Sequence, residues 1–227
     1  REMIGVGVST VDDQTILVED RLNPRAISLD QSIAQMRQLA IEMQQDAVEA
    51  VRTDNKTLAE LVHERDQEVD RLFAFVSRGF HRGLVDINEL NKLNMDWKTG
   101  FRYYKMAREL ERVGDRAERI ADIVSIQSTK PDEQIGSQFE KLVSTATDVV
   151  TLAMKDDTDG AIEAHRSVIE QLDEIDGELA GRQDPDAYLY GTNLVESARR
   201  TSARGLNIVN MMTETSVSDM LASTEVS

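Results

Sequence analysis

Residues 110–121 read LERVGDRAERIA, and the apolar pattern of this segment indicates the fold class. Leu110, Gly114, Ala117 and Ile120 recur every three or four positions, which places them on one face of an amphipathic helix. The same spacing continues on both sides, from about residue 87 to residue 124. The segment therefore predicts a long helix with one apolar face for packing.

Five other stretches show the same helical period, separated by short links. Ser28 opens the first stretch with a capping box, and Gly79 is expected to end the second. Asp184 precedes a first-turn proline at the start of the sixth, and Pro131 divides the stretches three and three. Short links predict an all-α, antiparallel six-helix bundle. The predicted helices cover about residues 28–51, 58–79, 87–124, 139–153, 162–179 and 189–212.

The two halves of the chain resemble each other. Residues 198–209, ARRTSARGLNIV, correspond to residues 110–121 on the third helix of each half. The preceding helices carry an E-V-D unit at residues 68–70 and an E-I-D unit at residues 174–176. Two diverged copies of one three-helix unit explain this arrangement.

The ends of the chain lie outside the helical pattern. Residues 3–10 and 15–20 are rich in strand-forming residues and flank a polar turn, so they predict a β-hairpin. The chain opens on Arg1 rather than Met, and we expect it to be part of a longer protein. The predicted organisation is a hairpin segment left from an N-terminal domain, two three-helix repeats and a disordered tail, over residues 1–24, 28–130, 131–217 and 218–227.

The composition excludes several classes of function. The 227 residues include 42 acids and 26 bases, and the net charge of −16 disfavours non-specific nucleic-acid binding. The absence of cysteine excludes disulfides, thiolate zinc sites and thiol nucleophiles. No apolar run approaches membrane-spanning length, so we expect a cytoplasmic protein without membrane insertion. Its 19 arginines against 7 lysines, beside so many acids, indicate adaptation to concentrated salt; the alternative is an ordinary acidic cytoplasmic protein.

Residues 110–121, together with residues 66–70, resemble the PhoU family of phosphate-uptake regulators. The family signature is an L-E-R-I-G-D-x-A-x-N-I-A-like segment on the third helix of each repeat, paired with a D-x-x-I-D segment on the preceding helix. The resemblance covers about residues 28–215. The hairpin is similar to the junction in archaeal relatives, of a haloarchaeal type, in which an AbrB-type DNA-binding domain precedes the PhoU domain.

The resemblance implies a non-enzymatic regulator of phosphate homeostasis that acts through protein–protein contacts. Its implied partners are the ATPase of a phosphate ABC transporter and a sensor or regulatory protein. We also expect a homodimer, and a transcriptional role only if a DNA-binding domain precedes the chain. A structural or scaffolding bundle without a metal or phosphate role is the alternative.

Four carboxylates form a candidate metal site. Glu111 and Asp115 lie one turn apart on one helix, and Asp66 and Asp70 repeat this spacing on the preceding helix. Like charges at this spacing repel by roughly 0.2–0.5 kcal/mol per pair, and a cation between the pairs would relieve the repulsion. The family resemblance implies metal ligation by these acids, and oxygen ligands suit Mg²⁺, Ca²⁺, Mn²⁺ or iron. A solvated acidic face is the alternative.

The second repeat departs from this pattern. Arg199 and Ala203 occupy the positions that match Glu111 and Asp115, and Leu172 occupies the position that matches Asp66. We therefore expect one cation site, confined to the first repeat.

No catalytic arrangement is recognisable. His63, His81 and His165 lack metal-ligand spacing, and His165 is expected to be a packing residue. A carboxylate-bridged di-iron enzyme needs two Glu-x-x-His units, and only one, Glu60 with His63, is present.

Overall fold

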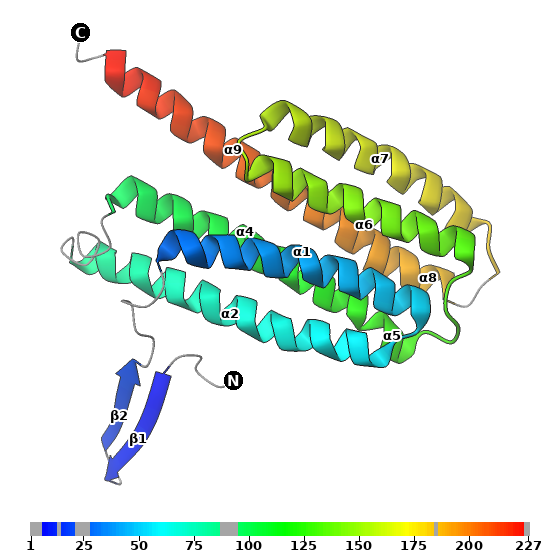
Figure 1. Ribbon diagram of the computed structural model, residues 1–227, viewed down its shortest axis with the longest axis horizontal. Coiled ribbons are helices and arrows are strands. Elements are labelled where there is room, and N and C mark those ends of the chain that lie inside the picture. The colour runs from blue at the N-terminus through cyan, green and yellow to red at the C-terminus, as the bar shows by residue number, and fades with distance from the viewer. Residues whose placement is uncertain (1–5, 13–14, 21–27, 87–94, 184–185, 225–227) are drawn as a thin grey trace.

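The computed structural model describes residues 6–12, 15–20, 28–86, 95–183 and 186–224. Within these residues six long helices pack into an elongated bundle (Figure 1), which confirms the predicted six-helix fold. The long helices are α1 (Leu29–Thr53), α2 (Lys56–Val85), α4 (Trp97–Ala121), α6 (Glu133–Ala153), α7 (Thr158–Ala180) and α9 (Glu196–Thr224). The shorter helical elements in the described ranges are α5 (Ile123–Ile126), α8 (Ala187–Leu189) and the π-helix η1 (Tyr190–Val195).

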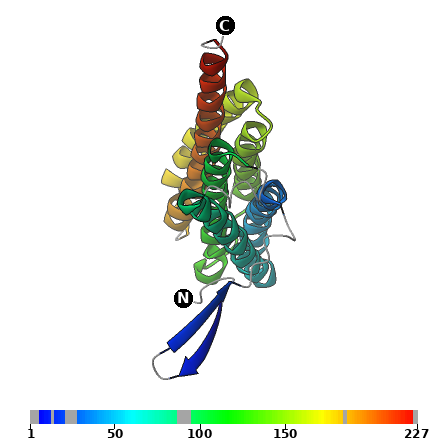
Figure 2. The same cartoon turned by 90° about the vertical axis from the view of Figure 1, so that its left-hand side faces the viewer.

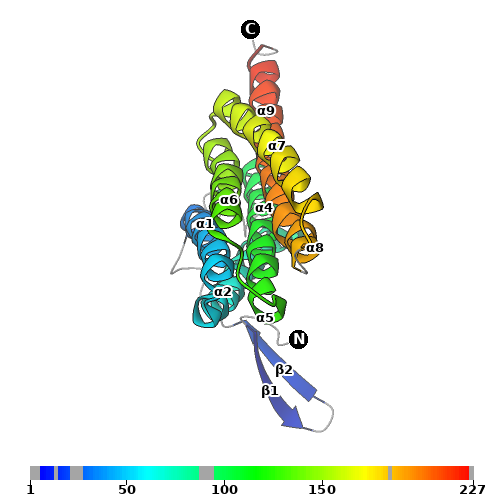
Figure 3. The ribbon, with the colours of Figure 1, turned by 90° about the vertical axis from the view of Figure 1, so that its right-hand side faces the viewer.

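The contacts group the helices three and three. Helices α1, α2 and α4 pack against one another, and α6, α7 and α9 do the same. The two units join through contacts of α4 with α9 and of α1 with α6 (Figure 3). One continuous core of apolar side chains runs through both units.

Side-chain caps define where most of the long helices begin. Ser28 Oγ accepts from the Gln31 amide at 3.2 Å and Gln31 Oε1 accepts from the Ser28 amide at 3.1 Å, so the predicted capping box is confirmed. Asn55, Asp96, Asp132 and Asp157 cap α2, α4, α6 and α7 in the same position. Each cap satisfies a backbone N–H that the first helical turn leaves unpaired.

The prediction that Gly79 ends the second helix is wrong, because α2 continues to Val85. The next residue, Phe80, is buried, and its ring stacks on Tyr104 of α4 with centroids 5.1 Å apart. A glycine inside a helix costs only about 1 kcal/mol relative to alanine, and burial of one aromatic side chain outweighs that. The predicted start of the third helix, at residues 87–94, lies outside the described residues.

The predicted disordered tail at residues 218–227 is also wrong in large part, since α9 is helical to Thr224. No glycine or proline follows Gly205 to stop the helix, and adding residues to an existing helix needs no new nucleation. The predicted start of the sixth helix at Asp184 and Pro185 lies outside the described residues.

The sequence pattern did not indicate the π-helix η1 that leads into α9. Asp186 accepts hydrogen bonds from the backbone amides of Ser128 and Thr129 at 2.8 and 2.9 Å, and the Tyr190 hydroxyl donates to Thr129 O at 2.8 Å. These contacts hold the start of this segment against the link between the repeats. The wide π turn then buries Leu194 as well as Tyr190.

Ahead of the helices, β1 (Val6–Asp12) and β2 (Thr15–Asp20) pair as antiparallel strands. The register places Val8 opposite Val18 and Thr10 opposite Ile16. Figure 2 shows this pair of strands extending away from the helices.

One buried amide connects three helices. Gln44 of α1 is fully buried, and its Nε2 donates to Val113 O of α4 at 2.7 Å and to Thr201 Oγ1 of α9 at 3.1 Å. The two repeats therefore meet at a polar contact inside an apolar core.

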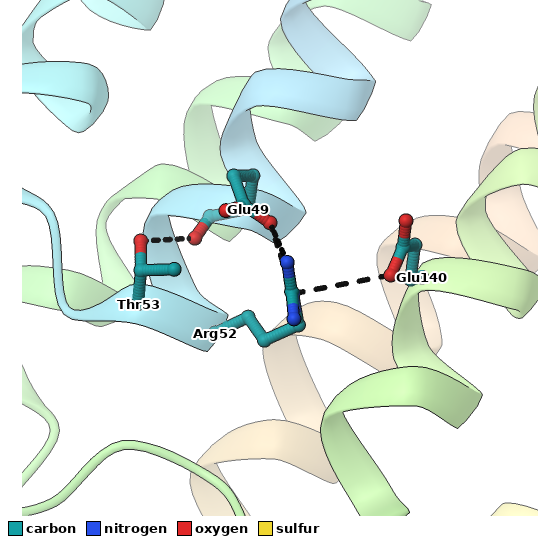
Figure 4. Close-up of polar contacts among 4 residues, drawn as sticks. All are labelled: Glu49, Arg52, Thr53 and Glu140. Carbon is teal, nitrogen blue, oxygen red and sulfur yellow. Dashed lines mark hydrogen bonds and ion pairs between the residues drawn. The ribbon is translucent and has the colours of Figure 1, made fainter. Parts of the chain in front are cut away.

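A second link between the repeats lies at the surface (Figure 4). Arg52 of α1 donates to Glu49 Oε2 at 2.6 Å, and its Nε lies 3.9 Å from Glu140 Oε2 of α6. The Arg52 stem packs over Gly136, where an added Cβ would lie 3.0 Å from Arg52 Cγ. Exposed pairs of this kind contribute roughly 0–1 kcal/mol, so the core carries most of the inter-repeat stability.

We expect Gly205→Ala to destabilise the bundle by about 1–3 kcal/mol, because α6 approaches α9 too closely for a methyl group. An added Cβ would lie 2.6 Å from Val149 Cγ1 and 2.9 Å from the Val149 and Val150 backbone. Chemical denaturation measures the change. Gly177→Ala on α7 is the control: nothing lies within 4 Å of its added Cβ, so about 0.5–1 kcal/mol of stabilisation is expected. Equal effects at both positions would contradict the close packing at Gly205.

Candidate metal site

The four predicted acids lie on the facing sides of two antiparallel helices. Asp66 and Asp70 are on α2, and Glu111 and Asp115 are on α4. The negative charges of Asp70, Asp115 and Glu111 all act on Asp66, so the structure brings the four acids of the prediction together.

Gly114, the glycine of the LERVGD segment, lies directly against the α2 acids. A Cβ at Gly114 would lie 3.4 Å from Asp66 Oδ1 and 3.6 Å from Val69 Cγ1, which are ordinary contact distances. The α4 backbone at Gly114 therefore forms part of the packing that buries the Asp66 carboxylate.

Burial and mutual repulsion disfavour the charged forms of these acids. Burial is the first cause that raises the pKa of Asp66 to about 7, and the charges of Glu118, Asp70, Asp115 and Glu111 add to it. Burial likewise raises the pKa of Glu111 to about 7, with further contributions from Asp115 and Asp70. The pKa of Asp115 is raised as well, again chiefly by burial. A proton or a metal cation would each relieve this repulsion.

Glu111 and Asp115 also line a pocket of about 370 Å³ between α2 and α4. Its other polar lining residues are Ser77, Tyr104, Arg108 and Arg112, and Arg108 donates to the Tyr104 hydroxyl at 3.3 Å. The two arginines lower the pKa of Glu111, although burial and the neighbouring acids outweigh them.

Chemically, the four carboxylates fit a hard cation, since they offer only oxygen donors. Among the described residues, however, no three histidine or acidic side chains converge closely enough to hold a metal ion. The acids are therefore placed together but not arranged as a coordination shell, and metal binding stays a prediction.

Two further acids, Glu118 and Asp122, extend the acidic row, and His63, to which the sequence assigned no role, lies against both. His63 Nδ1 lies 3.1 Å from Glu118 Oε1, and His63 Nε2 lies 3.4 Å from Asp122 Oδ1. Glu118 follows Asp115 by three positions, so the helical spacing along α4 could have revealed it. His63 could not have been found this way, because its contact with α4 is a tertiary one. His165 is elsewhere: it is half-buried beside Ser202 Oγ at 2.6 Å, in the second repeat.

In the second repeat an arginine replaces the acids. Arg199 Nη2 lies 3.3 Å from Asp176 Oδ2, the acid that corresponds to Asp70, and Arg199 Nε lies 3.3 Å from Glu196 Oε2. Leu172, at the position of Asp66, is fully buried. This half of the chain therefore balances its carboxylates with its own guanidinium group.

The chain is similar to known proteins in sequence over its first repeat and in fold over most of its length. Residues 33–124, which span α1, α2 and α4, match the family model described as the PhoU domain. The solved structure of PhoU from Pseudomonas aeruginosa is similar, with a TM-score of 0.60 and 21% identity, over 81% of this chain and 92% of that chain. A search of curated proteins found no significant match.

The first repeat, which carries the candidate acids, is thus similar to a PhoU domain, and the bundle as a whole has a PhoU-like fold. None of the helices in the described ranges combines the length and apolarity needed to cross a lipid bilayer.

We expect the stability of the chain to fall as the pH rises from about 4 to 7. Native Asp66 and Glu111, with pKa values of about 7, bind protons more tightly than in the unfolded chain, where values near 3.8 and 4.5 apply. Their protonation therefore favours the folded state at low pH, and this contribution is lost as the pH passes through 7. Thermal melts across this range should show Tm decreasing by at least ~2 °C.

Glu111→Gln should reduce this pH dependence, because it removes one of the three carboxyl groups whose pKa is raised. Glu163→Gln is the matched control, since Glu163 is exposed on α7 and paired only with Arg166 among the described residues. A Glu111→Gln variant whose Tm falls with pH as steeply as that of the parent would rule out Glu111 as a source of the pH dependence.

Proposed function

We propose that the chain is a PhoU-like regulator of phosphate homeostasis that acts in the cytoplasm by binding other proteins rather than by catalysis. The observation that carries this proposal is the match of residues 33–124 to the PhoU domain, on a bundle whose two repeats share that fold. The acidic face between α2 and α4 lies within the matched segment.

An exposed aromatic pair supports a role in protein–protein contacts. The rings of Trp97 and Phe101, at the start of α4, stack with centroids 5.5 Å apart, while 50% and 38% of these residues remain exposed. Large aromatic side chains at a surface are enriched in protein interfaces and often dominate their binding energy. The partners that we propose are the ATPase of a phosphate ABC transporter or a sensor or regulatory protein.

We further propose that Glu111, Asp115, Asp66 and Asp70 hold one divalent or trivalent cation. Support comes from their mutual repulsion and from the contrast with the second repeat, where Arg199 supplies a positive charge beside Asp176. Mg²⁺, Ca²⁺, Mn²⁺ and iron all suit oxygen donors, and a bound cation would fix α2 against α4.

The N-terminal strand pair and the charge composition support proposals about the origin of the chain. The β1–β2 strand pair ahead of the bundle supports a preceding AbrB-type domain, and with it a transcriptional role. The 42 acids and the preference for arginine over lysine support a salt-adapted, archaeal origin. We also propose that two copies of the chain form a homodimer.

Metal should raise the melting temperature at pH 8, because a cation that binds only the folded state stabilises it by mass action. Differential scanning fluorimetry with Mg²⁺, Ca²⁺ or Mn²⁺ measures the rise. The double variant Glu111→Gln, Asp115→Asn should abolish the rise and slightly stabilise the metal-free form, since it removes repulsion at constant shape. Arg199→Gln should leave the response unchanged; a double variant that responds like the parent would leave a solvated acidic face as the explanation.

The partner proposal is tested with the phosphate-transporter ATPase from the same genome. Size-exclusion chromatography and biolayer interferometry should detect a complex, and Trp97→Ala with Phe101→Ala should weaken it about tenfold or more. Tyr188→Ala is the control, because Tyr188 is an aromatic residue that is 82% exposed on the short helix α8. If neither the ATPase nor a sensor protein encoded beside it binds the chain, the scaffolding alternative is favoured.

A further inference from the structure

Four arginines lie along the junction of α4 and α9, on a different side of α4 from the acidic face. Arg116 and Arg119 come from α4, and Arg200 and Arg204 come from α9. The two helices run side by side (Figure 3). The positive charges of Arg119, Arg200 and Arg204 all act on Arg116, so the four side chains form one cluster.

Polar contacts define the antiparallel course of the two helices here. Glu109 of α4 lies 3.0 Å from Asn207 Nδ2 and 3.5 Å from Arg204 Nη1. One turn further along α4, Val113 O and Thr201 Oγ1 of α9 both accept hydrogen bonds from Gln44 Nε2. The next turn of α4 brings Arg116 towards Arg200, and Arg119 continues the row one turn later.

Positive charge exceeds negative charge in this cluster. Arg200 pairs with Glu196 at 2.7 Å and Arg204 with Glu109 at 3.5 Å, and the charge of Asp115 also acts on Arg116. Arg116 and Arg119 form no hydrogen bond or ion pair with any other residue in the described part of the chain. An excess of guanidinium groups is unexpected at a helix junction in a chain of net charge −16.

Burial makes this excess of positive charge less favourable. Arg116 and Arg204 are half-buried, and the Nε atom of each is buried without an acceptor among the described residues. Burial, followed by the charges of Arg119 and Arg200, lowers the pKa of Arg116, and the group nevertheless stays charged at neutral pH. Buried donors without protein partners are rare in folded proteins, and an ion that binds beside them would supply the missing acceptor.

We propose that the Arg116, Arg119, Arg200 and Arg204 cluster binds a small multivalent oxyanion of the phosphate class. Planar guanidinium groups donate paired hydrogen bonds to such oxygens, and several of them converge here from two helices. The anion would neutralise the repulsion among the arginines and would contact both repeats at once. This goes beyond the proposed function, which concerns protein partners and requires no bound anion.

The test is isothermal titration of the metal-free chain, in the presence of a chelator, with inorganic phosphate and with pyrophosphate. The ionic strength is held constant with KCl, so that general screening does not change during the titration. We expect saturable binding of at least one of the two anions at one site per chain. Arg116→Gln combined with Arg119→Gln should weaken it about tenfold or more, because two charged donors are lost.

Arg166→Gln is the control for Arg119→Gln, since it makes the same change of one charge at an exposed residue of α7, far along the chain from the cluster. Arg119→Gln alone, at an exposed position, carries the test if the double variant fails to fold. The proposal is overturned if neither anion binds the parent saturably, or if Arg166→Gln weakens binding as much as the cluster variants. Binding of the ATPase partner is measured separately, so failure of the anion site leaves the proposed function standing, and the reverse also holds.

Discussion

Gln44 makes the buried polar contact on which the arrangement of the two repeats depends. Its amide donates to Val113 O of α4 and to Thr201 Oγ1 of α9 from a fully buried position on α1. Leaving buried donors unpaired costs roughly 1–3 kcal/mol each, so few other positions of these three helices are acceptable. With this contact in place, one side of α4 faces α2 and another faces α9, and the chemistry of both sides follows from that.

Helix α4 separates two opposite kinds of charge. Glu111 and Asp115 meet the α2 acids on one side, where burial and repulsion raise their pKa values. Arg116 and Arg119 meet the α9 arginines on another side. Each group disfavours the folded state when no counter-charge is present, because burial and like charges raise the free energy of its charged side chains. Such groups are typical of sites at which a protein binds charged ligands, and both occur on the helix that joins the repeats.

The sequence predicted most of the fold because the signals were local. The apolar period around Leu110, the capping box at Ser28 and the break at Pro131 each act within a few residues, and each matches the structure. The prediction that the second helix ends at Gly79 failed, because a single glycine destabilises a helix less than the burial of Phe80 stabilises it. The acids Asp66 and Glu111 could be paired from helical spacing and family resemblance. The contact of His63 with Glu118 and the arginine cluster could not, because each joins residues that are brought together only by tertiary packing.

The divergence of the repeats also makes the two halves of the bundle chemically inequivalent. Two identical three-helix units related by an approximate two-fold axis would offer a partner two equivalent docking orientations, half a turn apart. Replacement of the acid pair by Arg199 and Ala203 removes that equivalence, because the same partner surface would meet carboxylates on one half and a guanidinium group on the other. A duplicated fold thereby carries two chemically different halves, which a charged surface docking against it would distinguish.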